Sequence, residues 1–482
     1  MIGMISKKHN ESQKDTNQSI YNIIYIFMGL FLLLIIYFII FLTVKSDEVI
    51  NNTYNKRQGV LAERIIRGDI LSADGDVLAR TVMDEEGVES REYPYGEIFA
   101  HVVGRASKGM SGIEQTENIR LLTSDINTFE KMFHELSNIK SPGNHVITTL
   151  DSNLSQIAYD ALGDNRGAVV VMEPSTGKIL VMVSKPSYDP NRIDELWEDF
   201  MNDEGDDSPL LNRATQGLYS PGSTFKVLTA LAFMREYPDY IDYDYRCEGH
   251  IEHQGMVIHC SNKKVHGEVD LTESLAKSCN SSFAHIATML DLDSFYSLNE
   301  DFNFNKSLPV SIISNPSSYT LRKANSSIKE AMQTAIGQGK TLITPLHNAM
   351  IISTIANGGV MMKPYVVDRI ENAEGERIKK YTPQIAAKPM TAYEAHYISE
   401  MLRQVVTDGT ATNLKNLEVE AAGKTGSAEN MGKKAHAWFI GFAPADQPEI
   451  AISVIVENVG SGNTHAVPIA RKVFDAYFDN KK

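Results

Sequence analysis

One serine and one lysine have the spacing that a helical nucleophile and its base require. Ser223 and Lys226 form an S-x-x-K motif that follows Pro221-Gly222 and opens an apolar stretch predicted to be a helix. Residues three apart lie on one face of a helix, and the helix N-terminus offers N–H groups to a developing oxyanion. A partly desolvated lysine could lose its proton there and activate the serine hydroxyl. The motif therefore predicts nucleophilic catalysis by Ser223 with Lys226 as the base.

The S-x-x-K spacing alone is not specific. Five other matches occur, and an N-capping serine with an exposed lysine explains any one of them. These matches begin at Ser137, Ser175, Ser261, Ser274 and Ser326. Ser223 differs from them in the Pro-Gly turn before it, the apolar helix after it and the two motifs downstream.

The two downstream motifs supply polar groups suited to proton transfer and to anion binding. Ser278-Cys279-Asn280 offers a hydroxyl and an amide, and Lys424-Thr425-Gly426-Ser427 offers a cation and hydroxyls for a carboxylate. Glycine in a strand lets a ligand backbone approach closely, which suits Gly426. Each motif alone is explained by a turn or a cap. Together, and in this order, they provide a nucleophile, a base, a proton shuttle and a carboxylate clamp.

The composition is that of a globular protein with several folding units. The chain has 482 residues, 43% of them hydrophobic, and a net charge of −15 from 46 basic and 61 acidic residues. This length predicts about two to four domains. No nucleic-acid partner is expected, because the acidic balance repels a polyanion and the sequence contains no Lys/Arg-rich run. Three cysteines are too few for a disulfide scaffold, and without a C-x-x-C motif no metal site is predicted.

An uncharged apolar segment over Ile23–Val44 predicts one transmembrane helix. A helix of about 22 residues is roughly 33 Å long, enough to cross the bilayer core. The segment is longer than the apolar part of a signal peptide and ends in charged residues, so we expect an uncleaved anchor; a buried core helix is the alternative. Basic residues are equal in number on the two sides, so charge does not set the orientation. Those counted are Lys7, Lys8 and Lys14 before the span and Lys45, Lys56 and Arg57 after it.

Turn signals and apolar periodicity divide the chain into four parts. Residues 1–21 are a tail, 22–44 the anchor, 45–143 a smaller β-rich module and 144–482 a larger domain. The β-rich module is predicted to contain a hairpin at Asp74-Gly75, because glycine tolerates the positive φ of such turns.

The larger domain is predicted to be α+β. Strands at both ends and helices between them favour an antiparallel sheet flanked by a helical subdomain. The predicted strands are 167–173, 178–184, 437–443 and 450–456, and the predicted helices are 155–162, 329–336, 345–356 and 466–478. The acidic stretch 194–207 is predicted to be a solvated loop.

The order S-x-x-K, S-x-N, K-T-G resembles the signature of penicillin-binding proteins and serine β-lactamases. The chain looks like a class B, monofunctional penicillin-binding protein of the short type without appended C-terminal modules, and the similarity runs from residue 67 to the C-terminus. It implies a transpeptidase domain preceded by a non-catalytic, pedestal- or dimerisation-like module. The supporting segments are 67–71, 112–114, 167–170, 187–191, 212–214, 266–267, 337–339 and 436–441. One departure is Ser72-Ala73, where the family often has Asp-Arg.

The resemblance implies roles for the catalytic residues. Ser223 would attack the penultimate D-alanyl carbonyl of a peptidoglycan stem peptide and expel the terminal D-alanine. Lys226 would take the proton of Ser223. Ser278, held by Lys226 and Asn280, would relay that proton to the leaving amine.

The resemblance also implies that the K-T-G-S segment binds substrate. Lys424 and Thr425 would hold the terminal carboxylate of the peptide. Gly426 would let the peptide backbone approach the strand, and the N–H groups of Ser223 and Ser427 would form the oxyanion hole. No metal or organic cofactor is needed in this scheme.

The resemblance further implies a membrane-anchored D,D-transpeptidase that β-lactams acylate. Its partners would be peptidoglycan stem peptides, β-lactams, the cytoplasmic membrane and a glycan-polymerising enzyme. The substrate lies outside the cytoplasmic membrane, so the catalytic domain would be extracytoplasmic and the tail cytosolic. A D,D-carboxypeptidase or a β-lactamase would use the same acylation apparatus. A catalytically quiet divisome or elongasome scaffold is an alternative from another class, whereas a β-lactam sensor would need a larger cytosolic part.

Cys279 lies inside the S-x-N motif, but a catalytic thiol is not expected there. We expect Cys279 to be buried or, in an oxidising exterior, bridged to Cys260 or Cys247, with Cys260 favoured. Packing or site-wall roles, rather than ligand roles, are expected for His266 and His436. Trp438 is expected to pack beneath the K-T-G strand, with a place in the substrate groove as the alternative.

Overall fold

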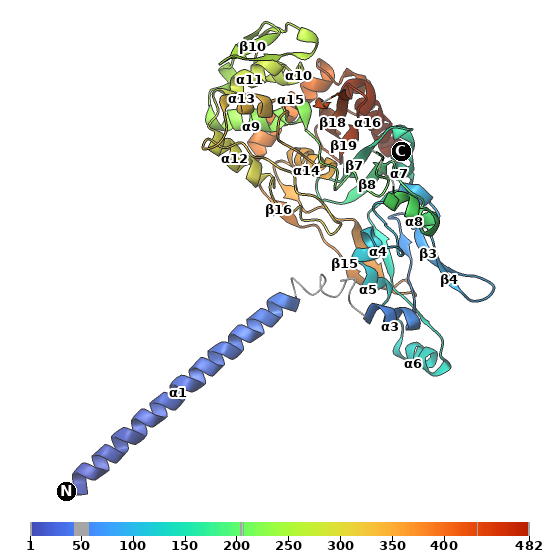
Figure 1. Cartoon of the computed structure of the whole chain (residues 1–482), viewed down its shortest axis with the longest axis vertical. Coiled ribbons are helices and arrows are strands. Elements are labelled where there is room, and N and C mark those ends of the chain that lie inside the picture. The colour runs from blue at the N-terminus through green and yellow to red at the C-terminus, as the bar shows by residue number, and fades with distance from the viewer. Residues whose placement is uncertain (1, 43–56, 203–204, 206, 431, 481–482) are drawn as a thin grey trace. The chain divides into compact units, whose positions relative to one another are not determined.

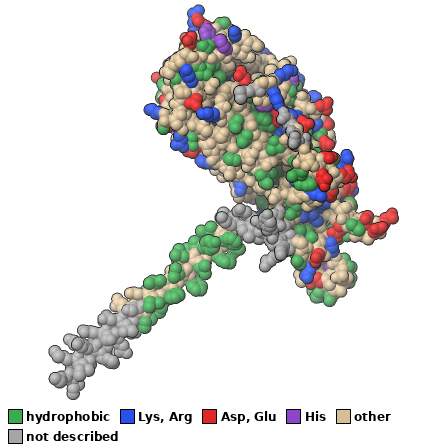
Figure 2. Space-filling view, in the orientation of Figure 1, with side chains coloured by type: hydrophobic (Ala, Val, Ile, Leu, Met, Phe, Trp, Pro, Cys, Tyr) green, Lys and Arg blue, Asp and Glu red, His purple; other side chains and the backbone are tan. Residues whose placement is uncertain are grey.

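The computed structural model describes residues 2–42, 57–202, 205, 207–430 and 432–480 (Figure 1). The chain divides into two units, residues 1–60 and 61–482. In the first unit α1 (Ile2–Ile40) is a single helix, and its section Ile20–Ile40 is long and apolar enough to cross a membrane. Figure 2 shows the apolar side chains exposed along this section. The predicted anchor coincides with α1 as far as Ile40, and its last positions, 43 and 44, lie outside the described residues.

The larger unit is built around a five-stranded antiparallel sheet in the order β17-β18-β19-β7-β8. Strands from the two ends of the predicted catalytic domain meet in it, because β19 pairs with β7. The strands are β7 (Gly167–Met172), β8 (Ile179–Lys185), β17 (Ala422–Asn430), β18 (Lys433–Ala443) and β19 (Ile450–Val456). The antiparallel sheet predicted from the apolar strand pairs is confirmed.

Two pairs of helices cover this sheet. Helix α14 (Pro345–Ala356) contacts β7, β18 and β19, and its neighbour α15 (Ala392–Thr407) contacts β17. Helix α16 (Gly462–Asp479) contacts β17, β18 and β19, and its neighbour α7 (Ser152–Leu162) contacts β8. Strands β7 and β19 are buried at every position, as expected of strands covered on both faces.

A helical subdomain completes the predicted α+β architecture. Its helices are α9 (Lys226–Glu236), α10 (Leu271–Ala276), α11 (Asn280–Ala287), α12 (Leu292–Asp301) and α13 (Ile328–Ala335). It also carries two ribbons of paired strands. One pairs β9 (Tyr245–Cys247) with β12 (Gly267–Val269), and the other pairs β10 (His250–His253) with β11 (Met256–His259).

A second sheet of six strands crosses the predicted boundary at residue 143. Its order is β15-β14-β6-β2-β3-β4. The strands are β2 (Ile70–Leu71), β3 (Val77–Met83), β4 (Glu89–Glu92), β6 (His145–Thr148), β14 (Val367–Glu371) and β15 (Arg377–Lys380). The predicted hairpin at Asp74-Gly75 joins β2 to β3, with Gly75 at φ +93°. The β14–β15 hairpin extends this sheet from the catalytic half of the chain through its pairing with β6.

The remaining described elements are short or peripheral. They are α3 (Arg57–Arg64), α4 (Gly112–Thr116), α5 (Asn118–Leu121), α6 (Thr128–Ser137), β1 (Ile65–Ile66), β5 (Ser141–Pro142), β13 (Met361–Met362) and β16 (Ile385–Ala387). Strand β1 pairs with β5, and β13 pairs with β16.

The prediction of a solvated loop over 194–207 is wrong for its first half. Helix α8 (Ile193–Asn202) occupies that part of the chain. Its Trp197 and Phe200 pack against a small cluster that includes buried Tyr188. The acidic residues between them are exposed, so the charge run is the solvent face of an amphipathic helix.

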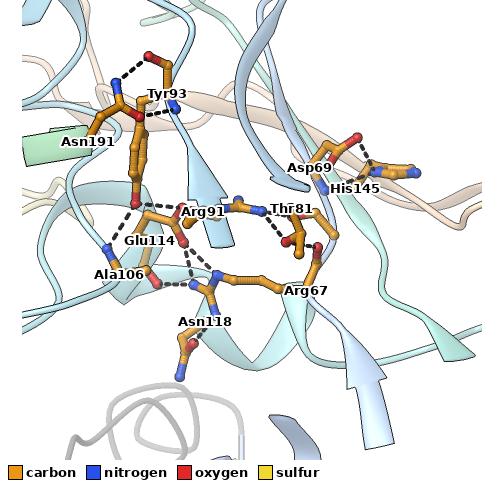
Figure 3. A network of polar contacts seen from close by, with 11 residues as sticks. Arg67, Asp69, Thr81, Arg91, Tyr93, Ala106, Glu114, Asn118, His145 and Asn191 are labelled. Carbon is orange, nitrogen blue, oxygen red and sulfur yellow. Dashed lines mark hydrogen bonds and ion pairs between the residues drawn. The ribbon is translucent and has the colours of Figure 1, made fainter. Parts of the chain in front are cut away.

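A buried carboxylate joins strand β4 and the segment before β2 to the short helix α4. Glu114 is fully buried, and its Oε2 accepts a hydrogen bond from Arg67 Nε at 2.7 Å while its Oε1 accepts one from Arg91 Nε at 2.8 Å (Figure 3). Arg91 also donates to the carbonyl of Gly68. Burial opposes ionisation of Glu114, but the two guanidinium groups outweigh it and hold the pKa of this carboxyl below its usual range. The carboxylate therefore ties three segments together.

We expect Glu114→Gln to lower the free energy of unfolding by about 3 kcal/mol, because it leaves two buried guanidinium groups without a countercharge. Denaturant unfolding of the detergent-solubilised protein measures this change. Glu92→Gln is the matched control, since Glu92 pairs with Arg80 at the exposed surface and its loss should change stability little. Equal destabilisation by the two substitutions would contradict this account of Glu114.

Candidate active site

Ser223 lies in a short 3₁₀ turn, η4 (Gly222–Thr224), that leads into α9. Gly222 has φ +56°, a left-handed conformation that glycine adopts without strain. Its N–H donates to the carbonyl of Gly337 at 2.8 Å, and a Cβ at Gly337 would lie only 1.8 Å from the Gly222 oxygen. The contact of these two backbones fixes the turn that carries Ser223.

The same turn lies against the edge strand β17. A Cβ at Gly222 would lie 2.9 Å from the carbonyl oxygen of Ser427, and one at Gly426 would lie 3.1 Å from Cγ2 of Thr224. Ser223 is partly exposed, whereas Gly222 and Thr224 on either side are buried. The glycines therefore place a reachable hydroxyl between the sheet edge and the head of α9.

The amine of Lys226, in the first turn of α9, joins this helix to the S-x-N segment. Its Nζ donates to Oδ1 of Asn280 at 2.7 Å, to the carbonyl of Ser278 at 2.8 Å and to Oγ of Ser278 at 3.2 Å. The side chain is fully buried. Burial lowers the pKa of this amine to about 8, because the charged form loses its hydration. The structure thus brings Lys226, Ser278 and Asn280 together.

The S-x-N residues form the connection between α10 and α11. Ser278 has φ +55°, an uncommon left-handed conformation for serine, and Cys279 is the N-cap of α11. Asn280 begins that helix, and its Nδ2 donates to the carbonyl of His259 at 2.9 Å. With the amide nitrogen held on β11, the amide oxygen is directed to Lys226.

The K-T-G-S residues lie on β17. Lys424 is fully buried, and its Nζ donates to the carbonyl of Thr425 at 3.0 Å. Burial, together with the charge of Lys226, lowers the pKa of Lys424 well below its usual range. The hydroxyl of Thr425 lies 2.6 Å from that of Thr410, and Ser427 is exposed. The strand therefore combines a buried amine and a held hydroxyl beside the turn of Ser223.

Several contacts at the site were not predicted from the sequence. Gly337 supports the turn of Ser223, Thr410 holds the Thr425 hydroxyl, and the His259 carbonyl orients Asn280. The Gly337-Gln338-Gly339 segment was a visible signal, since paired glycines often mark close backbone approach. Nothing in the sequence around Thr410 or His259 indicated their contacts, because each is made through long-range packing.

The predicted packing role of Trp438 is confirmed. It is fully buried in β18 opposite Gly426, and its Nε1 donates to the carbonyl of Ser220 at 3.1 Å. His436 is half-buried, and its Nδ1 accepts from the N–H of Asn458. Both residues lie in β18, the strand that pairs with β17.

The expected burial of Cys279 is confirmed, but the favoured bridge to Cys260 is not formed. All three cysteines are free and buried. The sulfur atoms of Cys260 and Cys279 are 3.8 Å apart, far beyond the roughly 2.05 Å of a disulfide bond.

A partly exposed serine at a helix head, a buried amine one turn later and a second buried amine on an adjacent strand are the groups that a serine acyl-transfer site would need. Residues 167–475 match the penicillin binding protein transpeptidase domain, and residues 67–146 match the penicillin binding protein A dimerisation domain. The first match spans more than half of the chain. The chain therefore belongs to the penicillin-binding protein transpeptidase family, among its class B members.

Proteins of known activity or structure resemble this chain in sequence and in fold. The chain is 31% identical over 481 residues to the peptidoglycan D,D-transpeptidase PbpA of Mycolicibacterium smegmatis, covering 90% of this chain and 91% of that protein. The D,D-transpeptidase domain of a peptidoglycan glycosyltransferase from Eggerthella lenta has a TM-score of 0.78 at 32% identity, over 87% of this chain and 99% of that chain. Penicillin-binding protein A of Mycobacterium tuberculosis, in a ceftriaxone acyl-enzyme complex, has a TM-score of 0.79 at 30% identity, over 86% and 99%.

We expect the rate constant for acylation of this protein by a labelled penicillin to rise with pH up to about 8 and then level off. Below that pH the Lys226 amine is protonated and cannot accept the serine proton, so the rate should fall by about tenfold per pH unit. Stopped or quenched-flow labelling on both sides of this pH measures the profile. A flat profile, or a rise centred near the ordinary lysine value of 10.5, would contradict a desolvated Lys226 base.

Proposed function

We propose that this chain is a membrane-anchored serine D,D-transpeptidase that cross-links peptidoglycan stem peptides through an acyl-enzyme on Ser223. The observation that carries the proposal is the buried amine of Lys226, in the helix turn that follows Ser223. This amine donates hydrogen bonds to Ser278 and Asn280. The relatives support the reaction class, since the Mycolicibacterium PbpA is a peptidoglycan D,D-transpeptidase and the Mycobacterium protein was solved as an acyl-enzyme.

The hydrogen bonds of Lys226 suit it to hold, as an ammonium, the proton that Ser223 gives up in this proposal. An ammonium group has three donors, and the three oxygens around Nζ match them. A neutral amine has two donors and a lone pair, so one of these contacts is not needed until protonation. The acceptors are therefore in place for the ammonium that forms when Ser223 attacks the substrate carbonyl.

Ser278 is the group that completes the proton transfer in this proposal. Its Oγ lies 3.2 Å from Lys226 Nζ, so it can accept a proton from the ammonium while donating its own to the leaving D-alanine amine. Asn280 holds the amine in reach by a shorter contact of 2.7 Å. The C–N bond of the donor peptide breaks as this proton arrives, and the acyl group remains on Ser223.

The strand β17 binds the donor peptide in this proposal. The terminal carboxylate faces Lys424 and Thr425, and an anion there offsets the repulsion between the amines of Lys424 and Lys226. The N–H groups of Ser223 and Ser427 bind the oxyanion. The two residues belong to segments that touch at Gly222, which supports a shared oxyanion hole.

An amine from a second stem peptide then attacks the ester and forms the cross-link. A D,D-carboxypeptidase differs only in that water attacks instead. A catalytically quiet scaffold would not form the ester at all. Both alternatives are therefore outcomes of the same experiment.

We expect the wild-type protein to form a covalent penicillin adduct and, with a donor thioester, to transfer the acyl group to an added D-amino acid. Ser223→Ala should abolish the adduct and the transfer, because the nucleophile is removed. Ser175→Ala is the matched control, since Ser175 begins another S-x-x-K motif and its exposed hydroxyl donates to Glu173 in a surface turn. Intact-protein mass spectrometry and product analysis measure both.

Three results would contradict the proposal in different ways. An adduct that persists in Ser223→Ala would exclude this nucleophile. Hydrolysis without transfer would favour a carboxypeptidase. Absence of any adduct in the wild type would favour the scaffold.

We also propose that the tail precedes a single membrane span and that the catalytic unit lies outside the cytoplasmic membrane. The apolar section Ile20–Ile40 supports the span, and the extracytoplasmic location of peptidoglycan supports the orientation.

The two matched domains are named for transpeptidation and dimerisation, so we propose that a partner enzyme polymerises the glycan strands. Reconstitution that yields cross-linked glycan only with such an enzyme tests the partner.

We expect protease added to intact protoplasts to remove a C-terminal epitope tag and to spare an N-terminal tag, because only the catalytic unit is outside. Immunoblotting of both tagged proteins measures this. Permeabilised cells, in which both tags should be digested, serve as the control. Loss of the N-terminal tag alone in intact cells would reverse the proposed topology.

A further inference from the structure

Three cysteines and one histidine converge in the helical subdomain. The three sulfur atoms and a ring nitrogen, from Cys247, Cys260, His266 and Cys279, all lie within 4.8 Å of one another. The cysteines are fully or almost fully buried, and His266 is half-buried. No C-x-x-C motif signals this cluster in the sequence, because each ligand comes from a different segment.

The two strand ribbons bring these segments together. Cys247 ends β9 and pairs with Gly267 of β12, which follows His266 directly. Cys260 follows β11, and its N–H donates to the carbonyl of Gly249 at 2.9 Å. Cys279 joins them as the N-cap of α11. The backbone pairing of the subdomain therefore fixes the cluster.

The distances within the cluster fit a tetrahedral metal site. The Sγ of Cys260 is 3.7 Å from that of Cys247 and 3.8 Å from that of Cys279. Two thiolates bound to Zn²⁺ at about 2.3 Å lie about 3.8 Å apart in a tetrahedron. Nδ1 of His266 is 3.3 Å from the Cys247 sulfur, near the roughly 3.6 Å expected for a sulfur and a nitrogen on the same ion.

The surroundings suit thiolates rather than packed thiols. The N–H of Gly249 points to the Cys247 sulfur at 3.4 Å, and the N–H of Ser282 points to the Cys279 sulfur at 3.4 Å. The hydroxyl of Ser281 donates to the Cys247 sulfur at 3.2 Å. Donors of this kind support metal-bound sulfur from outside the ligand shell. Cys279 also gains from the positive end of α11.

The ribbons contribute few buried apolar side chains. Val269 lies in the cluster around the cysteines with Tyr245 packed against it, and Ile258 of β11 joins the main core. Small strand ribbons of this kind gain stability from a structural metal, whose binding energy contributes directly to folding. Three thiolates and one imidazole form a closed tetrahedral set of the type that selects zinc.

We propose that Cys247, Cys260, His266 and Cys279 bind one Zn²⁺ as a structural site, and that this ion positions Ser278 and Asn280 for Lys226. The ligand Cys279 lies between Ser278 and Asn280 in sequence. The ligand Cys260 follows His259, whose carbonyl holds the Asn280 amide. The ion thus fixes two parts of the chain that position the S-x-N turn: Cys279 within the turn, and the residue next to His259, whose carbonyl holds Asn280. The positioning role rests on the proposed function, whereas the zinc site does not.

Metal content of the full chain, purified in detergent without added metal, tests the site. We expect one zinc per chain, three unbridged cysteines by intact mass, and thiolate-to-metal charge-transfer bands after replacement by Co²⁺. His266→Ala should lose the zinc, while His266→Cys, which keeps four ligands, should retain it. His250→Ala is the matched control, because this exposed imidazole lies on the neighbouring ribbon outside the cluster.

Penicillin acylation of the same variants tests the positioning role. We expect the acylation rate constant of folded His266→Ala to fall by at least about tenfold and to recover in His266→Cys. Acylation that is unchanged without zinc would overturn the positioning role. A wild-type chain without zinc and without the cobalt bands, or with a disulfide among these cysteines, would overturn the site itself. Neither unchanged acylation without zinc nor a wild-type chain that lacks zinc would remove the penicillin adduct on Ser223. The proposed function is therefore tested separately from the zinc site.

Discussion

The proposed chemistry depends on keeping one amine away from water while surrounding it with oxygen acceptors. Burial of Lys226 removes the hydration that would otherwise keep it charged at neutral pH. The contacts to Ser278 and Asn280 join that amine, at the start of α9, to the first residue of α11 and the turn before it. An exposed lysine at the same position would stay protonated near neutral pH and could not accept the serine proton. The desolvation is therefore the feature that turns an ordinary helix-head serine into a candidate nucleophile.

Close backbone contacts supply the rigidity that this arrangement needs. The turn of Ser223 is held between Gly337 on one side and β17 on the other, at separations that no Cβ would permit. Gly426 allows the same approach from the strand. These contacts join the five-stranded sheet to the helical subdomain at the site itself. A shift of the sheet or of the helical subdomain would change the distance between Ser223 and Lys424 of β17. The geometry of the site therefore depends on both parts.

Much of this organisation could be predicted from the sequence. The order of the motifs at Ser223, Ser278 and Lys424 led to a prediction of the site residues, of which the structure brings Lys226, Ser278 and Asn280 together. Apolar periodicity predicted the hairpins of the central sheet. Residues 194–202 were mispredicted because negative charge hid the apolar face of α8. The pairing of β14 with β6 was missed because these two strands lie far apart in the sequence. Pairing over such separations leaves no local pattern to read.

The cysteine cluster escaped prediction for the same reason. Its ligands are spaced by the strand ribbons rather than by a short motif, and a redox argument alone favoured a disulfide instead. Its place beside the S-x-N turn connects the stability of a small subdomain to the orientation of Asn280. The desolvation of the Lys226 amine, on which the proposed chemistry depends, can be tested without substrate. Carbon-13 NMR of the labelled Lys226 side chain should show a titration midpoint near 8. A midpoint at the ordinary lysine value of 10.5 would contradict the account.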